Sequence, residues 1–171
     1  MNKLKKIVII NGVNQSGKDT FIHFVATNSD LTVKNISTVD KVKEAAVLLG
    51  WNMEKDELGR QALHDLKKLG NKYFNHAIRY VDTCVMNNEF DIMFVHCREV
   101  AEIEYFKRTY GKNCMSLLVH NDRVKAACNK ADQDVYKVKH YDWVIYNGAT
   151  LDDLKELAIT FVAAIKDDLN K

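Results

Sequence analysis

The stretch IINGVNQSGKDTF, residues 9–21, decides the fold. Gly12, Gly17 and Lys18 have the spacing G-x-x-x-x-G-K of a phosphate-binding loop. An apolar run precedes the first glycine and an amphipathic run follows the lysine, so the motif lies in the strand, loop and helix setting that it requires. This context favours a true phosphate loop over a glycine-rich turn that carries a surface lysine.

The chemistry of the loop explains its residue types. Glycines let backbone N–H groups curl around an anion, and the N-terminus of the following helix adds partial positive charge. Lys18 is expected to neutralise the β- and γ-phosphates of a nucleotide and to act in catalysis. The residues expected to bind the nucleotide are Gly12, Asn14, Gln15, Ser16, Gly17, Lys18, Asp19 and Thr20.

Asp19 stands where the common motif has serine or threonine. That hydroxyl normally ligates Mg²⁺, and a carboxylate is also a good hard oxygen ligand for this ion. Thr20 follows one position later, about 100° further round the helix, and is expected to point to the α-phosphate side. The sequence therefore predicts that Asp19 is the metal ligand and that the phosphate cradle is kept.

Composition indicates one globular domain, residues 1–171, that acts inside the cytoplasm. Hydrophobic residues make up 47% of the chain and charged residues 28%, and no apolar run is long enough to span a membrane. Acidic and basic residues are interleaved and the net charge is only +2, so nucleic acid is not an expected partner. The four cysteines show no paired spacing, which is typical of reduced structural thiols. The six histidines show no metal-ligand spacing, and only His96 falls next to the expected site.

Five short runs, rich in residues that favour β-structure, alternate with amphipathic segments. The runs are nearly continuous in apolar residues, as in strands covered on both faces, and they span 6–11, 31–36, 90–97, 114–120 and 141–147. Alternating strands and helices predict a three-layer α/β/α fold with a five-stranded parallel sheet. Ligands are expected at the carboxyl ends of the strands.

The helices are predicted from periodicity and capping residues. The first begins within the loop, runs to about residue 28 and places Ile22, Val25 and Ala26 inward; the last begins at Thr150 and buries Leu151, Leu154, Ala158, Phe161 and Ile165. A second begins near Ser37 and Asp40, which have the spacing of a capping box, buries Leu49 among others and ends at Gly50. A long helical region covers 54–87, with a break expected at Gly70-Asn71, and residues 99–110 form another helix, which Glu99 is expected to cap.

Several stretches resemble a known group of proteins. SGKDT after an apolar strand is similar to the phosphate loop of bacteriophage deoxynucleoside monophosphate kinases and of animal phosphomevalonate kinases, in the nucleoside monophosphate kinase-like branch of P-loop proteins. VDKVKEAAVLLGW, KDELGRQALHDLK, VHCREVAEIEYFK and YDWVIYNGATLDDLKELA resemble, in order, segments of small phage and bacterial nucleotide kinases. The resemblance covers nearly the whole chain, and it implies a P-loop NTPase fold and a kinase that uses ATP and Mg²⁺.

A monophosphate kinase needs a second anion site, built from cationic side chains, for its acceptor. Arg98 closes the third apolar run, at the end of a strand, and is the first candidate to grip the acceptor phosphate or to bridge both phosphates. The resemblance implies that the region of about 38–88 clamps the monophosphate, which makes Lys41 and Arg60 the next candidates. A solvated helix face explains these two charges equally well. Asp65 and Tyr73 are weaker candidates for reading a base or sugar.

A polar, basic segment of about residues 121–140 lies between the fourth and fifth strands. Related kinases place there an arginine-bearing lid that closes over ATP. Arg123 is its only arginine and is therefore a candidate catalytic residue, with Lys125 and Lys130 as lesser candidates.

The sequence thus predicts phosphoryl transfer from ATP to a (deoxy)nucleoside monophosphate, a small-molecule substrate. Two alternatives stay open: a kinase for another phosphorylated metabolite, and a nucleotide-binding accessory protein without catalysis. A homodimer is also left open.

Overall fold

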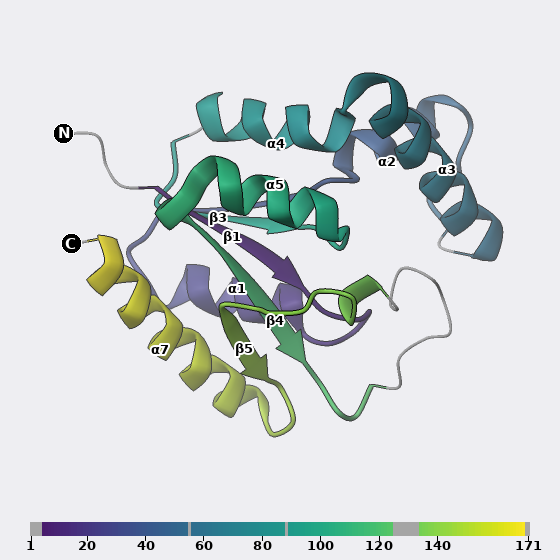
Figure 1. Cartoon of the computed structure of the whole chain (residues 1–171). Coiled ribbons are helices and arrows are strands. Elements are labelled where there is room, and N and C mark those ends of the chain that lie inside the picture. The colour runs from purple at the N-terminus through teal and green to yellow at the C-terminus, as the bar shows by residue number, and fades with distance from the viewer. Residues whose placement is uncertain (1–4, 55, 88, 125–133, 170–171) are drawn as a thin grey trace. The chain divides into compact units, whose positions relative to one another are not determined.

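The computed structural model describes residues 5–54, 56–87, 89–124 and 134–169 (Figure 1). Lys55, Lys125, Cys128 and Lys130 lie outside the described residues. The strands are β1 (Lys6–Asn11), β2 (Val33–Ser37), β3 (Ile92–His96), β4 (Cys114–His120) and β5 (Trp143–Tyr146). The helices are α1 (Lys18–Thr27), α2 (Asp40–Leu48), α3 (Glu57–Phe74), α4 (His76–Asn87), α5 (Val100–Tyr110) and α7 (Leu151–Leu169), with a 3-10 turn at Gly111–Asn113.

The chain divides into two compact units. The first unit comprises Met1–Asn35 and Glu89–Lys171, and it holds four of the five strands together with α1, α5 and α7. The second unit, Ile36–Asn88, holds α2, α3 and α4. Its range is close to that of the segment 38–88 expected to bind the acceptor, a role that stays a prediction.

The five strands form one parallel sheet in the order β2-β3-β1-β4-β5. β1 occupies the centre, where Ile9 lies opposite Val95 of β3 and Ser116 of β4. Parallel neighbours cannot be joined by a tight turn, so helical crossovers connect the strands and bring their carboxyl ends to one edge. The predicted five-stranded parallel sheet is confirmed, and the expected bounds of the first and fourth strands are the observed ones.

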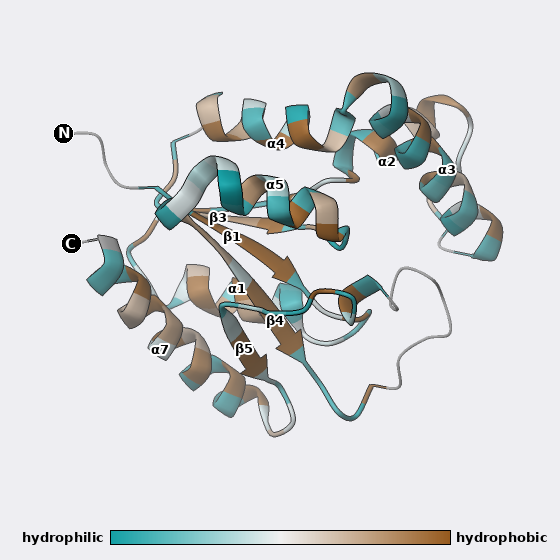
Figure 2. Ribbon diagram, viewed as in Figure 1, coloured by the Kyte–Doolittle hydropathy of each residue, from teal (hydrophilic) through white to brown (hydrophobic). Residues whose placement is uncertain are grey.

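Helices cover both faces of the sheet in the first unit. Val8 and Ile10 of β1 belong to one buried cluster with Phe21 of α1 and Phe161 of α7. Successive strand residues point to opposite faces, so the equally buried Ile9 faces the other side, where α5 packs against β4. Figure 2 shows β1, β3 and β4 brown along their length, as expected for strands that are apolar on both faces. The three-layer α/β/α arrangement is therefore confirmed.

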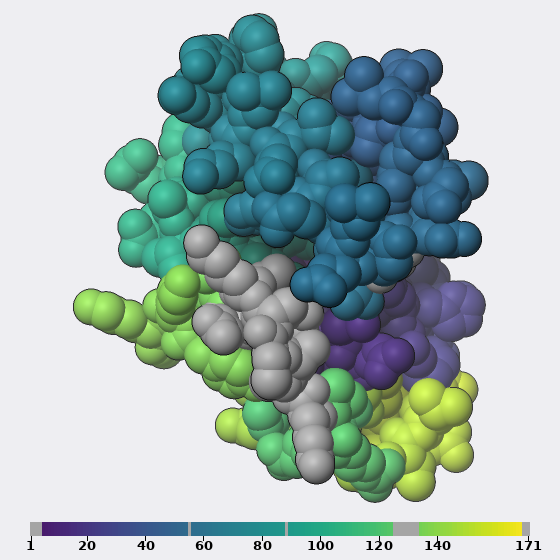
Figure 3. Space-filling view, turned by 90° about the vertical axis from the view of Figure 1, so that its right-hand side faces the viewer, coloured from purple at the N-terminus to yellow at the C-terminus, as the bar shows by residue number. Residues whose placement is uncertain are grey.

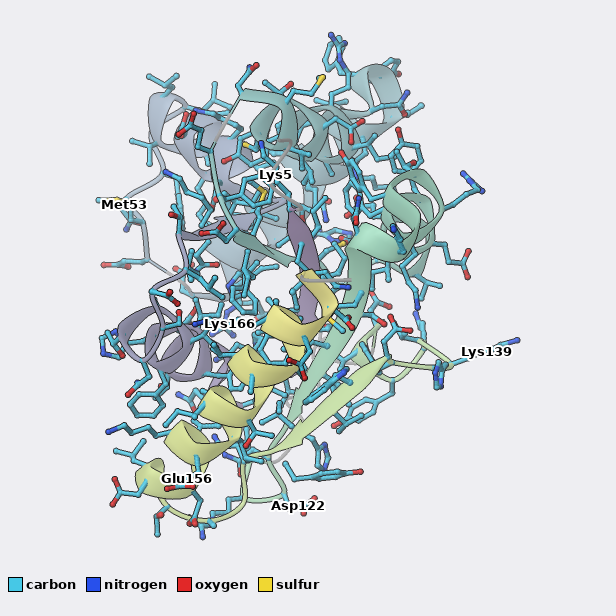
Figure 4. All side chains as sticks on the ribbon, turned by 90° about the vertical axis from the view of Figure 1, so that its left-hand side faces the viewer. Lys5, Met53, Asp122, Lys139, Glu156 and Lys166 are labelled. Atoms are coloured by element: carbon cyan, nitrogen blue, oxygen red, sulfur yellow. The ribbon has the colours of Figure 1, made fainter. Side chains whose placement is uncertain are left out.

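Polar contacts fix the last helix at both ends. Thr150 and Asp153 form a reciprocal cap, in which the backbone N–H of each residue donates to the other's side chain, at 2.8 and 3.2 Å. Near the other end, Lys166, labelled in Figure 4, forms an ion pair with Asp30, which follows α1. The predicted helix start at Thr150 is thus confirmed. Among the described residues, no helix combines the length and the apolar character needed to cross a bilayer.

The break between α3 and α4 lies at Asn75, so the predicted break at Gly70-Asn71 is wrong. Asn75 adopts a left-handed conformation with φ of 48°, which asparagine tolerates better than most residues do. The side chain of Asn71 accepts a hydrogen bond from Ala77 N–H at 3.0 Å and so caps the start of α4. Gly70 lies inside α3, where an added Cβ would approach the His76 Cβ at 3.3 Å.

Some side chains expected to be buried are exposed instead. Ala26 is exposed, and Leu49 and Leu151 keep 75% and 67% of their surface, because these positions lie at helix ends or on outer faces. The other expected members of the first and last helices are buried. In the second unit α3 also exposes Leu58, while Lys67 is buried and donates a hydrogen bond to Thr38 Oγ1 at 3.1 Å. Periodicity located these helices, but it did not identify every side chain that each one buries or exposes.

Asp142 anchors the start of β5 to β4 and α5. Its carboxylate accepts hydrogen bonds from the Ser116 N–H and hydroxyl groups at 2.7 and 2.9 Å, and from Lys107 at 2.9 Å. Burial alone would raise the pKa of this carboxyl, but these partners outweigh it and hold the pKa below its ordinary value. The ionised carboxylate is therefore favoured in the folded protein.

We expect Asp142→Asn to lower the free energy of unfolding at pH 7 by about 1–3 kcal/mol, the value of hydrogen bonds to a charged group. Because the pKa is depressed, this stabilisation is present above the ordinary pKa of aspartate and is lost as the pH falls below about 4. Urea unfolding at pH 7 and at low pH measures the difference, with the exposed Asp152→Asn as control. A difference that stays constant across this pH range would contradict the assignment.

Candidate phosphate-binding site

The loop between β1 and α1 requires glycine at its two marked positions. Gly12 has φ of 146°, and an added Cβ would lie 2.5 Å from the Val119 carbonyl oxygen of β4. Gly17 has φ of 101°, and its Cβ would lie 2.3 Å from Asn147 Nδ2. Both values are rarely adopted by residues with a side chain, and neither position has room for one. The backbone can therefore curl as a phosphate loop must.

Lys18 begins α1 and folds back over the loop. Its ammonium group donates hydrogen bonds to the carbonyl oxygens of Gly12 and Val13, both at 2.7 Å, and lies 3.3 Å from Ser16 Oγ. Ser16, itself a loop residue, is fully buried. The positive charge is thus held among the loop residues, where the sequence placed it.

Backbone N–H groups of the loop are open to an anion. Among the described residues, none accepts a hydrogen bond from the N–H of Gln15, Gly17 or Asp19. Gln15 has φ of 62°, so a left-handed residue lies inside the loop, and such turns direct successive N–H groups toward one side. The N–H groups of the first turn of α1 also lack helical partners.

A chain of hydrogen bonds that the sequence did not predict supports the first glycine. Asn11, the last residue of β1, accepts a hydrogen bond from Gly12 N–H at 2.8 Å and donates one to the Tyr141 hydroxyl at 2.9 Å. That hydroxyl donates to the Val135 carbonyl at 2.9 Å. Burial raises the pKa of Tyr141, so the phenol stays protonated and remains a donor. These side chains position the entry to the loop.

Asn147 supports the other end of the loop. Its side chain donates a hydrogen bond to the Ser16 carbonyl oxygen at 2.9 Å, and its backbone N–H donates one to the His120 carbonyl oxygen at 2.7 Å. Asn147 follows β5 and His120 ends β4, so three strand ends converge on the loop. Figure 3 shows purple atoms of the N-terminal segment at the surface, bordered by yellow atoms of the C-terminal segment. Polar residues at strand ends were the only sequence signal for this support.

Asp19 presents its carboxylate to solvent at the start of α1. Its side chain is 88% exposed, and its Oδ1 lies 3.6 Å from His96 Nε2 at the end of β3. An exposed carboxylate beside a phosphate loop is free to take a metal ion on its open side. Thr20, one position further along α1, is partly buried. His96 thus lies next to the expected site, because its side chain is close to that of Asp19.

Arg98 follows β3 and lies two residues beyond His96, partly buried at the ligand edge of the sheet. Next to it, the buried Cys97 thiol donates to the Glu102 carboxylate at 3.1 Å. Glu99 is the cap residue of α5, but its side chain makes no capping hydrogen bond, so its expected capping role is not seen. Cys97, Glu99 and Glu102 hold ligand atoms within 4.8 Å of one another, and the Cys97 to Glu102 hydrogen bond is one of these contacts.

Arg123 lies beyond the end of β4, at the start of the expected lid. Its guanidinium donates to the Ala149 carbonyl at 3.1 Å, in the turn that leads into α7. Asn147 belongs to the same turn, so Arg123 is held near the strand ends that support the loop. The structure describes lid residues 121–124 and 134–140.

Lys41 and Arg60 belong to the second unit, which is described by itself. Lys41 lies in the first turn of α2 and donates to both carboxylate oxygens of Glu44, at 2.9 and 2.7 Å. Arg60 is exposed in the first turn of α3, where the Asp56 side chain caps the helix through Gly59 N–H at 2.7 Å. Of the weaker candidates on the same helix, Asp65 accepts a hydrogen bond from Gln61 at 2.9 Å and Tyr73 is exposed.

Solved structures of small kinases have the same architecture as this chain. A gluconokinase from Sinorhizobium meliloti is similar with a TM-score of 0.55 and 11% identity, over 99% of this chain and 98% of that one. The thymidylate kinase of Candida albicans gives 0.55 and 12%, over 96% and 93%. The APS kinase of Mycobacterium tuberculosis gives 0.50 and 11%, over 93% and 97%. The fold is that of the P-loop kinases.

These likenesses concern the P-loop kinase fold and not the chemistry of the chain, since the identities are low. No family model and no curated protein sequence matches the chain. The assignment of the site therefore depends on the geometry of its own residues. That geometry fits a nucleotide phosphate with a divalent metal, because open N–H groups, one ammonium group and one exposed carboxylate meet at a loop that no Cβ can fill.

Proposed function

We propose that the protein transfers the γ-phosphoryl group of ATP to a (deoxy)nucleoside monophosphate. The observation that carries this proposal is the loop of residues 12–20, with its open N–H groups, the Lys18 ammonium group and the Asp19 carboxylate, at the carboxyl edge of a parallel sheet. The resemblance of the SGKDT loop and of the later segments to nucleotide kinases supports a nucleoside monophosphate as the acceptor.

In the proposed transfer, one bond to the γ-phosphorus forms as another breaks. An acceptor phosphate oxygen forms a bond to the γ-phosphorus, and the bond from that phosphorus to the β–γ bridging oxygen breaks, which leaves ADP. Lys18 and the loop amides hold the donor phosphates, and Arg98 and Arg123 offer guanidinium groups for the charge that spreads over the transferring group. Lys41 and Arg60 are the proposed contacts to the acceptor. Bound Mg²⁺ would neutralise donor phosphate charge, and Asp19 is the residue that offers it an oxygen ligand.

A coupled assay of ADP release tests this function. AMP, GMP, CMP, UMP, dAMP, dGMP, dCMP and dTMP are each offered as acceptor with ATP and Mg²⁺. Release that depends on one or more of these monophosphates is the expected result. ATP binding without monophosphate-dependent release would refute it, and would favour another phosphorylated acceptor or a non-catalytic role.

Replacement of Asp19 tests the metal assignment. We expect Asp19→Ala to lower turnover at least about tenfold and to change its Mg²⁺ dependence, because loss of groups around a metal typically weakens the site by that factor or more. ATP binding should change less, since the amides and Lys18 remain. Turnover is measured across a Mg²⁺ titration, with the exposed Asp167→Ala on α7 as control. If both quantities stay at their wild-type values, the carboxylate is not the anchor and Thr20 is the next residue to replace.

A further inference from the structure

Helix α3 of the second unit leaves a row of apolar side chains exposed. Leu58, Leu69 and Tyr73 keep 78%, 53% and 62% of their surface, and Ala62 is exposed as well. The spacing of these four residues along the chain places them on one face of the helix, called here the α3 stripe. Single exposed apolar residues are ordinary, whereas a continuous stripe marks a surface that binds another surface.

The face by which α3 packs within its own unit lies to one side of this stripe. Its buried residues are Gly59 and Lys67. An added Cβ on Gly59 would lie 2.4 Å from the Glu54 carbonyl oxygen, and Lys67 donates its hydrogen bond to Thr38. The second unit is therefore folded without covering the α3 stripe.

Charged side chains border the α3 stripe along its other edge. They are acidic in the first half of the helix and basic in the second, since Glu57 and Asp65 precede Lys68 and Lys72, and all four are exposed. The Lys72 ammonium group lies over the ring of Tyr73, 4.9 Å from its centroid. Among the residues that the structure describes, none pairs with Glu57 or Lys68. The edge thus has opposite charges at its two ends.

We infer that the α3 stripe binds the same stripe of a second copy of this chain, with the two helices antiparallel. A two-fold axis at the middle of the stripe, beside Leu66, pairs Leu58 of one copy with Tyr73 of the other and Ala62 with Leu69. Each apolar side chain of the stripe then meets an apolar side chain.

The charged edge fits the same axis. An antiparallel pair brings the same edge of both helices together, so Glu57 lies near Lys72 of the second copy and Asp65 near Lys68 of the second copy. The centre of each charge pair is one residue from the centre of the stripe, about 1.5 Å along the helix, which long side chains span. A parallel pair would place like charges together. This self-complementarity is what favours a second copy over an unrelated protein.

The stripe is separate from the proposed acceptor contact on the same helix. Arg60 lies about 160–200° round α3 from Leu58, Ala62 and Leu69, on the opposite side of the helix. Pairing through the stripe therefore leaves Arg60 uncovered. Association of two copies can be tested without any assumption about phosphoryl transfer.

Sedimentation equilibrium of the full chain, without nucleotide, is the first measurement. We expect twice the mass of one chain at high concentration and the mass of one chain on dilution. Leu69→Glu should raise the Kd of the dimer about 100-fold or more, because it occurs twice across the axis and each buried leucine contributes about tenfold or more. The control is Leu151→Glu, which changes an exposed leucine of α7 in the first unit and should leave the Kd unchanged.

Charge reversal tests the antiparallel pairing. Glu57→Lys alone and Lys72→Glu alone each bring like charges together twice, and each should raise the Kd about tenfold at low salt. In an equimolar mixture of the two variants, a dimer with one chain of each has opposite charges at both places. The mixture should therefore associate more tightly than either variant by itself. Glu156→Lys, on the exposed surface of α7, is the control and should leave the Kd unchanged.

Three results would overturn the inference. A wild-type chain that stays monomeric would leave the stripe to a partner other than a second copy. A dimer with the same Kd in Leu69→Glu would have its interface elsewhere. Mixed charge variants that associate no more tightly than the separate ones would exclude the antiparallel pairing. Circular dichroism should match the wild type for every variant, since the replaced side chains are exposed, so that weaker association is not a loss of folding.

Discussion

Phosphoryl transfer by the Lys18→Ala variant should fall at least about 100-fold, the typical loss when one group that stabilises transition-state charge is removed. Lys18 Nζ is held within 2.7 Å of two loop carbonyls, so its charge already lies where the donor phosphates are expected. Loss of this charge leaves the amides of the loop as the remaining contacts. The coupled assay of ADP release measures the effect.

The matched control for this variant is Lys155→Ala, which removes an exposed lysine of α7. Both proteins are compared for unfolding midpoint as well as for turnover, so that a loss of folding is distinguished from a loss of catalysis. We expect the control to keep wild-type turnover. Turnover that survives in Lys18→Ala would show that the loop is not the donor site, whatever the acceptor is.

The Gly12→Ala variant should lose about 3–5 kcal/mol of unfolding free energy, the sum of an overpacking term and a backbone strain term. The added Cβ would lie 2.5 Å from the Val119 carbonyl oxygen and 2.7 Å from Ser16 Oγ. The carbonyl belongs to β4, which pairs with both β1 and β5; Val119 lies opposite Ile145 of β5, so the strand cannot shift without disturbing this pairing. Urea unfolding of the full chain measures the loss.

Two other glycines of the first unit separate the causes. Gly111 has φ of 52° and ψ of −129°, with no atom within 4 Å of an added Cβ, so Gly111→Ala should lose only the backbone strain term of about 1–3 kcal/mol. Gly148 has open space and no such φ, so Gly148→Ala should stay within about 0.5 kcal/mol of the wild type. A Gly12→Ala variant no less stable than Gly111→Ala would contradict the proposed close contact.

Local patterns predicted most of the fold correctly. The bounds of β1 and β4 follow from unbroken apolar runs, and the start of α7 follows from Thr150 and its cap. The break at Asn75 was missed because glycine is the stronger general signal, whereas here an asparagine takes the left-handed position. Periodicity alone could not show that Leu58 is exposed and Lys67 is buried, because a periodic stripe does not reveal what packs against it.

The phosphate loop was predictable because its residues are consecutive. Its supports were not, since Asn11, Tyr141 and Asn147 come from different strands and meet only when the sheet forms. Residues that support the loop from other strands are invisible to motif spacing.

The hydrogen bonds of Lys18 to the carbonyl oxygens of its own loop also bear on how fast a nucleotide can bind. They keep the loop in shape before any anion arrives, with Asn11 and Asn147 fixing its two ends. The loop is thus preorganised. When ATP binds, the Lys18 ammonium group exchanges loop carbonyls for phosphate oxygens, and no loose segment has to become ordered. We therefore expect the entropic penalty of association at the loop to be small, because little of the loop has to become ordered when the anion binds.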